Sequence, residues 1–326
     1  MDGPGYSLGI DENGLGPRLG PLIVTAVIAR ISADGARVAH SRPKGKFRQR
    51  LGDSKALVSF GDSILGEAWA REVMKRSGVG EERASVDDLV HALSIDAKGT
   101  LRASCPSDHL EQCWNTAGEN LGADKKLLGQ VARDLDKLAA AGVEIVGARI
   151  AIVCTKRLND GVATGLSRFD VDLHTMERLV LFAREHVGQE IFATCGKVGG
   201  FDRYGERFGP MAGRLHVVLD EGRAKSVYKI PGIGTVAFVR DADATNLLVC
   251  MASLIGKWVR DSLMTRIVRY HRVHDPELPD ASGYHDPVTT RFIDASALTR
   301  KKRNVPDVCF VRDRLGREDE EVLDLP

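Results

Sequence analysis

The sequence has 326 residues, with 46 basic and 45 acidic side chains and a formal net charge of +1. Hydrophobic residues make up 43% and aromatic residues 6%, which is enough apolar content for a folded core and excludes a disordered chain. The charge balance also excludes a polycation that coats nucleic acid, so any nucleic-acid binding must use local clusters. The longest apolar run, residues 21–29, is too short for a membrane span. Because the N-terminus also lacks a signal-like segment, we expect a cytoplasmic protein without membrane contact.

The first elements of the chain are predicted to be a strand over residues 7–12, a glycine-rich turn, and a β-branched strand over residues 22–31. A short strand-like piece follows at residues 36–39. Helical periodicity predicts helices over residues 62–76 and 122–140. The start of the chain is therefore expected to be a hairpin with a glycine-rich loop.

The middle of the chain alternates strands with helices. Strands are predicted over residues 143–154 and 191–195, with a helix over about 171–186 between them. An amphipathic helix is expected after Asp243, and a shorter helix over residues 287–298. This alternation predicts an α/β architecture.

Two adjacent carboxylates, Asp11 and Glu12, stand at the end of the first predicted strand. Side chains alternate across a strand, so one of the two is expected to face the core and to need a compensating charge. A divalent cation that prefers hard oxygen ligands, Mg²⁺ or Mn²⁺, would supply it. The alternative is a solvated turn. Gly14 and Gly16 would let the backbone approach a sugar or a phosphate, or would simply form a tight hairpin.

The cysteines give a weaker metal signal. Cys105, His109 and Cys113 have helical spacing, but a zinc site needs a fourth ligand. Six cysteines in a chain of this length are too sparse for a disulfide scaffold. Partly buried, reduced thiols are the favoured interpretation.

Four motifs carry a resemblance to a known family. Residues 9–17 read Gly-Ile-Asp-Glu-Asn-Gly-Leu-Gly-Pro and are followed by Gly20-Pro21, which resembles the opening signature of type 2 ribonuclease H, ribonuclease HII. The further matches follow in the family's order: Asp53-Ser54-Lys55; Ala242-Asp243-Ala244 with Ala252-Ser253, Lys257 and Arg260-Asp261 downstream; and Ser282-Gly283-Tyr284 with Asp286-Pro287. Together they cover about two thirds of the chain.

The resemblance implies a ribonuclease H-like α/β fold, with a mixed sheet flanked by helices and a C-terminal helical extension. It also implies an endoribonuclease that uses Mg²⁺ or Mn²⁺ to cut RNA in RNA/DNA hybrids or at ribonucleotides embedded in DNA. The implied catalytic and metal-binding residues are Asp11, Glu12 and Asp243. The implied substrate-binding residues are Gly14, Gly16, Ser54, Lys55 and Tyr284. Alternatives remain a helix N-cap for Asp243, a surface lysine for Lys55 and a packed aromatic ring for Tyr284.

The sequence departs from the family at two places. In the glycine-rich loop, Leu15 stands where the family has an arginine, and Arg18 is near enough in sequence to compensate. The family's third acidic ligand falls, depending on the alignment, on Ala193, Thr194 or Gly196, none of which carries a carboxylate. The nearest carboxylates in sequence to test are Glu190, Asp202 and Asp241.

The missing carboxylate leaves more than one functional hypothesis open. A catalytically degenerate relative that binds hybrid nucleic acid without cleaving it is the main alternative, and another hydrolase on the same fold ranks last. We expect a catalytic domain over residues 1–265, with residues 60–145 as a helical insertion, and a C-terminal extension with a charged tail over residues 266–326. A monomer is favoured, with hybrid or ribonucleotide-containing DNA as its partner.

Overall fold

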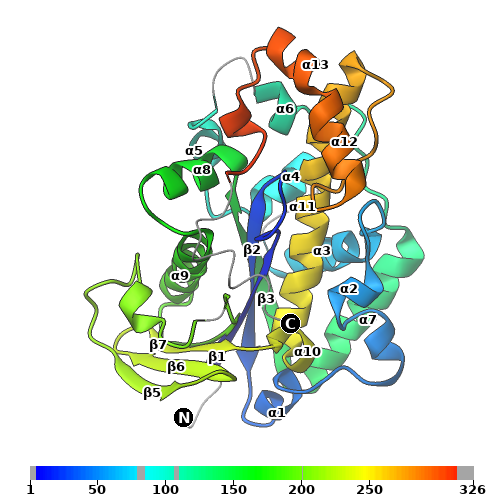
Figure 1. Cartoon of the computed structure of the whole chain (residues 1–326). Helices are drawn as coiled ribbons and strands as arrows, with labels where there is room; N and C mark the ends of the chain where they lie inside the picture. Colours follow the sequence, from blue (N-terminus) through cyan, green and yellow to red (C-terminus); the bar gives the residue numbers. More distant parts are fainter. Residues whose placement is uncertain (1–4, 79–84, 106–109, 200, 314–326) are drawn as a thin grey trace.

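A mixed β-sheet forms the centre of the computed structural model (Figure 1), which describes residues 5–78, 85–105, 110–199 and 201–313. Within these residues the sheet has seven strands in the order β3-β2-β1-β4-β7-β6-β5. The strands are β1 (Gly5–Asn13), β2 (Leu22–Ile31), β3 (Val143–Val153), β4 (Ile191–Gly196), β5 (Val217–Glu221), β6 (Lys225–Ile230) and β7 (Gly234–Val239).

The strand directions explain why the sheet is mixed. β1 is antiparallel to β2, as the predicted hairpin requires, and parallel to β4. β2 also pairs antiparallel with β3, and β4 pairs parallel with β7. β6 joins the edge strand β5 to β7 by antiparallel pairing. The expected mixed sheet flanked by helices is therefore confirmed. β5, β6 and β7 were not predicted.

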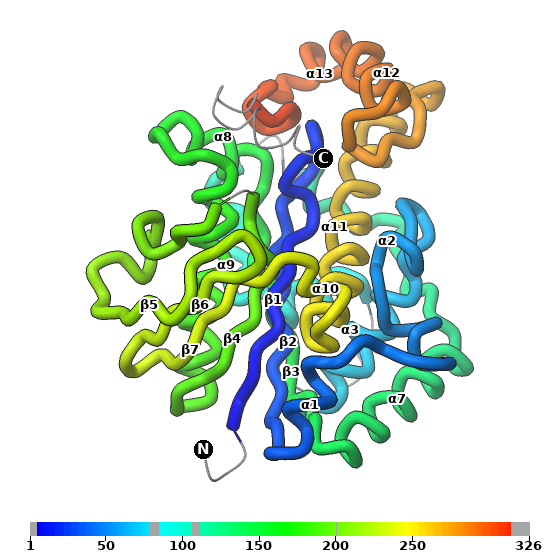
Figure 2. The backbone as a smooth tube through the Cα atoms, turned by 60° about the horizontal axis from the view of Figure 1, so that its bottom comes forward, coloured from blue at the N-terminus to red at the C-terminus, as the bar shows by residue number. Residues whose placement is uncertain are grey.

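The helices lie on both faces of this sheet and beyond one end of it (Figure 2). In chain order they are α1 (Gly35–Ala39), α2 (Ser54–Leu57), α3 (Ile64–Arg76), α4 (Val86–Leu93), α5 (Lys98–Arg102), α6 (Leu110–Trp114), α7 (Lys125–Ala140), α8 (Thr155–Ala163), α9 (Arg168–Val187), α10 (Ala242–Thr245), α11 (Leu247–His274), α12 (Pro287–Ala295) and α13 (Ala297–Lys302). The strand predicted over residues 36–39 is wrong, because these residues lie in α1. Its first turn forms when Ala36 N donates to the Ser32 carbonyl at 3.2 Å.

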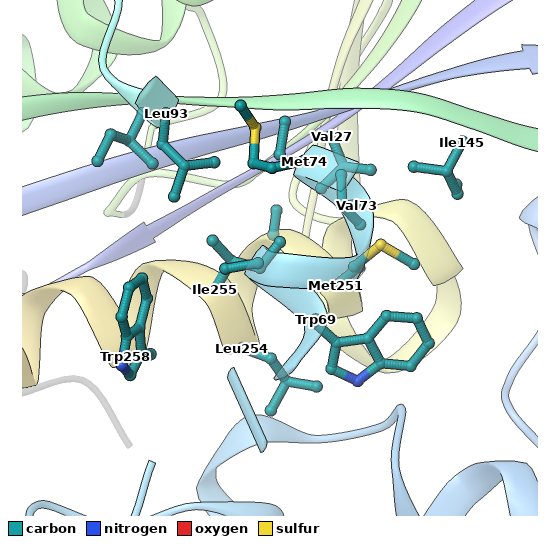
Figure 3. Close-up of a cluster of buried hydrophobic side chains, with 14 of the residues drawn as sticks. Val27, Trp69, Val73, Met74, Leu93, Ile145, Met251, Leu254, Ile255 and Trp258 are labelled. Atoms are coloured by element: carbon teal, nitrogen blue, oxygen red, sulfur yellow. The ribbon is translucent and has the colours of Figure 1, made fainter. Parts of the chain in front are cut away.

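One face of the sheet is covered by α11, α3 and α7, which enclose the larger hydrophobic core (Figure 3). Trp69 of α3 is fully buried in this core, which it shares with Met251 and Ile255 of α11. Its indole Nε1 donates to the Arg50 carbonyl at 2.6 Å, so the buried polar atom has a partner. Apolar residues three and four apart on α11 thus pack as its periodicity predicts.

A glycine lets α11 approach the central strand. A Cβ on Gly9 of β1 would lie 2.4 Å from the carbonyl carbon of Leu248, a distance at which the two backbones could not keep their positions. Gly9 therefore sets how closely α11 lies against β1, two residues before the acidic pair.

The opposite face is covered by α9. Ser167 caps this helix by accepting from Asp170 N, and the Asp170 side chain accepts from Ser167 N to complete a capping box. The predicted apolar side chains Met176, Val180 and Ala183 are all buried against the sheet.

The C-terminal elements form a third hydrophobic cluster at the end of α11. Phe292 and Phe310 stack with ring centroids 6.0 Å apart, beside His271 of α11. This packing confirms the expected C-terminal helical extension. The boundary expected at residues 265–266 lies inside α11, and the division into domains stays a prediction. No helix among the described residues is long and apolar enough to cross a membrane.

Candidate active site

The acidic pair lies where β1 extends past its neighbour β4. Pairing between these strands runs to Ile10 opposite Cys195, so Asp11 and Glu12 follow directly after the ladder. Alternation along β1 points Ile10 into the α9 core, and Glu12 follows it on that face, whereas Asp11 shares the α11 face with Gly9. The two side chains therefore leave β1 on opposite faces of the strand.

Asp11 is buried and interacts with α11. Burial raises the pKa of Asp11 well above its ordinary value, and the nearby charge of Glu12 raises it further, whereas a hydrogen bond from Ser253 opposes the shift. Ser253 Oγ lies 2.9 Å from Ser54 Oγ at the start of α2. A chain of hydroxyl groups thus connects the Asp-Ser-Lys motif to the first carboxylate.

This contact changes the interpretation of Ser54 and of the polar stripe on α11. The Ser54 side chain is buried and its hydroxyl is already engaged by Ser253. Lys257, one turn further along α11, donates to the Val58 carbonyl at 2.7 Å. The polar face of α11 therefore packs against the segment that contains α2.

Glu12 has the most informative surroundings of the acidic residues. Burial raises its pKa from 4.5 to about 8, and the next largest contribution is the negative charge of Asp172 on α9. The pKa of Asp172 is itself raised by burial and by the charge of Asp11. Asp172 therefore belongs electrostatically to the acidic pair, although no motif pointed to it.

Asp243 lies in the short helix α10, one turn before α11. Its carboxyl group is half-buried, which raises its pKa, and the charge of Asp53 adds to the shift while Lys55 opposes it. The N-cap alternative is wrong, because Asn246 caps α11 by accepting from Leu248 N and Val249 N at 2.9 and 3.2 Å.

Lys55 provides the positive charge at this site. Its ammonium group lowers the pKa values of Asp11, Glu12 and Asp243 alike, so it lies within electrostatic reach of all three. The side chain is exposed, and Asp53 orders its backbone by accepting from Lys55 N at 2.9 Å. The structure thus brings together four of the predicted site residues.

The glycine-rich loop and the Tyr284 loop lie side by side. Gly14 has a φ of +95°, and a Cβ there would lie 2.5 Å from Nε of Arg260. Arg260 reaches the second loop by donating to the Ser282 carbonyl at 3.2 Å, and its guanidinium lies 4.5 Å from the centre of the Tyr284 ring. His285 also donates to the Gly16 carbonyl at 3.1 Å. Both predicted ribose-contacting segments are therefore held together beside the acidic pair.

Of the three nearest carboxylates to test, two are paired with lysines and the third acts on Asp243 through its charge. Glu190 precedes β4, at the opposite end of that strand from Gly196, and pairs with Lys229 at 2.6 Å. Asp202 pairs with Lys197 at 2.6 Å. Asp241 is exposed and acts on Asp243 through its charge.

Gly196 is the position on β4 that faces the acidic pair. A Cβ on Gly196 would lie 3.2 Å from Oδ1 of Asp11 and 3.7 Å from Oε2 of Glu12. Of the three candidate positions for the missing aspartate, Ala193 lies in the α9 core. The structure therefore shows that a side chain at residue 196 would enter the site.

Divalent cations suit the chemistry of these carboxylate donors, although the carboxylates are not arranged around a common point in this structure. Within the described parts of the chain no three His, Cys, Asp or Glu side chains form a group that could hold a metal ion as placed. The carboxylates nevertheless raise one another's pKa, and both oxygens of Asp172 lack hydrogen-bond partners. A hard cation would relieve both conditions.

The candidate zinc ligands give no support for a second metal site. His109 lies outside the described residues, and Cys105 and Cys113 are free thiols. Burial raises the pKa of both, which favours the protonated form over the thiolate that binds zinc.

Comparison with known proteins yields structural likenesses only. No family model and no curated protein sequence matches this chain. It resembles ribonuclease HII of Archaeoglobus fulgidus, solved with PCNA, at 15% identity and a TM-score of 0.40, covering 96% of this chain and 99% of that one. It resembles Bst ribonuclease HIII, solved with Mn²⁺, at 11% identity and a TM-score of 0.45, covering 99% and 70%.

A third likeness is to ribonuclease H2 of Pyrococcus horikoshii, at 15% identity and a TM-score of 0.39, covering 98% of this chain and 100% of that one. At these identities and scores, the fold of the present chain rests on its own strand order and register.

Asp172 is the residue that sequence reasoning missed. It lies on the buried face of α9, one turn before Met176, where apolar side chains are interspersed with other buried polar ones such as Thr175 and Glu177. A carboxylate at a core position of a helix is an informative exception, because Asp is almost never fully buried without a partner. That exception was the available signal.

Proposed function

We propose that this chain is a metal-dependent endoribonuclease that cleaves RNA in RNA/DNA hybrids or at ribonucleotides embedded in duplex DNA. The observation that carries the proposal is the electrostatic grouping of Asp11, Glu12 and Asp243 around the exposed ammonium of Lys55. Three carboxylates from two separate segments with one cation suit a site that binds metal ions and a phosphate.

Asp11, Glu12 and Asp243 would hold Mg²⁺ or Mn²⁺ by their carboxylate oxygens. When bound, such ions supply an activated water and neutralise charge that develops on the phosphate and on the leaving oxygen. The hydroxyl of Ser253 fixes the orientation of Asp11. Because the three carboxylates are not preassembled, the side chains would close around the ions when these bind.

Lys55 and Ser54 would hold the backbone of the substrate. The exposed ammonium of Lys55 is available to a phosphate oxygen next to the carboxylates. The Ser54 hydroxyl contacts Ser253 in this structure. A direct phosphate contact by Ser54 would require that hydroxyl to exchange its partner.

The Gly14 to Gly16 loop and Tyr284 would distinguish RNA from DNA. The loop follows the acidic pair by one residue, and nothing lies within 4 Å of a Cβ at Gly16, which leaves the backbone there open to a 2′-hydroxyl group. The Tyr284 side chain is 45% exposed and its ring is supported from behind by Arg260. A ring held in this way can pack against a sugar.

The experiment is a cleavage assay with purified protein, Mg²⁺ or Mn²⁺, and a labelled duplex that contains one ribonucleotide. We expect a cut at the ribonucleotide, no cut in the all-DNA duplex, and no activity in Asp11→Asn. A wild-type rate no higher than that of Asp11→Asn would contradict the proposal.

The second candidate is a protein that binds hybrid nucleic acid without cleaving it. Gly196 favours this candidate, because its position faces the acidic pair without supplying a carboxylate. It predicts salt-sensitive binding that prefers a ribonucleotide-containing duplex, with no product at any metal concentration. Equal affinity for all-DNA duplex would count against it.

A further inference from the structure

Asp172 is a buried carboxylate without an evident structural role. Its exposed fraction is 0%, and neither Oδ1 nor Oδ2 has a hydrogen-bond partner among the described residues. The apolar residues Leu173 and Met176 stand beside it on α9. A carboxylate in such surroundings is unfavourable unless another group compensates its charge.

The charge of Asp172 acts on the acidic pair and not on a basic partner. It interacts electrostatically with Asp11 and is the strongest charged neighbour of Glu12. No ion pair of Asp172 is present in the described structure. Three carboxylates from β1 and α9 therefore act on one another, and the charge of Lys55 opposes that repulsion at Asp11 and Glu12.

Gly196 leaves room on the β4 side of this region. Its φ lies outside the left-handed range, so the backbone does not require glycine there. A side chain at residue 196 would start 3.2 Å from Oδ1 of Asp11. β4, which runs parallel to β1, thus faces Asp11 and Glu12 without a carboxylate of its own. α9 carries a carboxylate, Asp172, that β4 lacks.

We propose that Asp172 supplies the third carboxylate of the cation site, reaching Asp11 and Glu12 from α9 in place of a ligand on β4. This inference rests on the proposed function, because it assigns a ligand to the same metal ions. It explains why a fully buried carboxylate without a hydrogen bond is kept on the core face of a helix.

The competing explanation is that Asp172 is a protonated core residue. In that case its neutral isostere, asparagine, would leave metal binding unchanged and would affect folding alone. The two explanations therefore differ in a property that can be measured without any cleavage assay.

The experiment measures Mn²⁺ binding to the full chain by electron paramagnetic resonance of free Mn²⁺ and by calorimetry. We expect Asp172→Asn to weaken at least one Mn²⁺ by about 10- to 100-fold. The matched control is Asp202→Asn, which removes a carboxylate that is paired with Lys197 and should leave binding unchanged. Thermal unfolding of each variant shows whether it is folded, so that a loss of affinity caused by misfolding can be recognised.

A rescue variant keeps the inference testable if Asp172→Asn folds poorly. Gly196→Asp places a carboxylate on the β4 side, so Asp172→Asn with Gly196→Asp should regain Mn²⁺ affinity over Asp172→Asn alone. Wild-type affinity and stoichiometry in a folded Asp172→Asn protein would overturn the inference. Failure of the double variant to regain any affinity would also count against it.

The outcomes separate this inference from the proposed function. Cleavage by the wild type with unchanged Mn²⁺ binding in Asp172→Asn overturns the role of Asp172 and leaves the nuclease intact. Asp172-dependent Mn²⁺ binding without cleavage supports the ligand and contradicts the nuclease. Absence of Mn²⁺ binding to the wild type overturns both.

Discussion

Arg312 Nη1 donates to the carbonyl of Gly14 at 2.5 Å, which connects the C-terminal segment to the loop that follows the acidic pair. The same guanidinium donates to the Gly20 carbonyl from Nε and Nη2 at 2.9 and 2.6 Å. Arg312 is almost fully buried, and burial together with the charge of Arg260 lowers its pKa well below the ordinary value. Two arginines therefore contact the glycine-rich loop: Arg312 donates to its carbonyl groups, and Arg260 packs beside Gly14.

We predict that Arg312→Met destabilises the protein and weakens substrate binding. The substitution leaves buried carbonyl groups of the loop without donors, which costs about 1–3 kcal/mol of unfolding free energy. Denaturant titration measures the stability, and KM for a hybrid substrate measures how well the loop still contributes to substrate binding. Lys301→Met, at an exposed site on α13, is the control and should change neither. An unchanged KM in Arg312→Met would show that the loop does not depend on this contact.

A second prediction concerns the contact between β1 and α11. Gly9→Ala places a methyl group 2.4 Å from the backbone of Leu248, so the helix must shift. We expect a loss of about 1–3 kcal/mol in the free energy of unfolding, typical of overpacking. Gly5→Ala is the matched control, because nothing lies within 4 Å of a Cβ there. Equal stabilities of the two variants would contradict the close approach.

The pH dependence of stability should report Glu12. Its pKa is raised from 4.5 to about 8 in the folded protein, so the native state binds this proton more tightly than the unfolded chain does. The stability that it contributes is complete below pH 4.5 and is lost as pH rises toward 8. In metal-free buffer we expect Glu12→Gln to lose less stability than the wild type between these limits. Parallel stability profiles would contradict the raised pKa.

Asp243 gives a prediction on activity with little effect on folding. Its carboxyl group is half-buried and lies among like charges, so Asp243→Asn removes repulsion and should leave the melting temperature unchanged or raised. Cleavage should fall by at least about 100-fold, because an electrostatic contribution to the reaction is lost. Asp241→Asn, two residues earlier and exposed, is the control. Similar rates for the two variants would show that Asp243 is not part of the site.

Much of the fold follows from local patterns in the sequence. β2 is a continuous β-branched apolar run, and apolar residues on α11 recur at three- and four-residue spacing, so both elements were predicted. α1 was mistaken for a strand because so short an apolar piece shows no period. β5, with its exposed valines and Leu219, lacks the alternation that identifies a half-buried strand.

The site was predictable only where residues stand in motifs. Asp11, Glu12 and Lys55 were expected to meet, and the structure places their charges within reach of one another. Asp172 was not expected, because its partners are contributed by a strand about 160 residues earlier in the chain. Only the packing of α9 under β1 brings these residues together. Local sequence does not show that contact, although a carboxylate on the buried face of α9 indicates where it occurs.

The central claim is that the acidic group around Lys55 cleaves at ribonucleotides. The most direct measurement is the rate at which purified protein with Mn²⁺ cuts a duplex that contains a single ribonucleotide, compared with Asp11→Asn and with an all-DNA duplex. We predict cleavage at the ribonucleotide by the wild type alone. Equal product from the wild type and Asp11→Asn, or equal cutting of the all-DNA duplex, would contradict it.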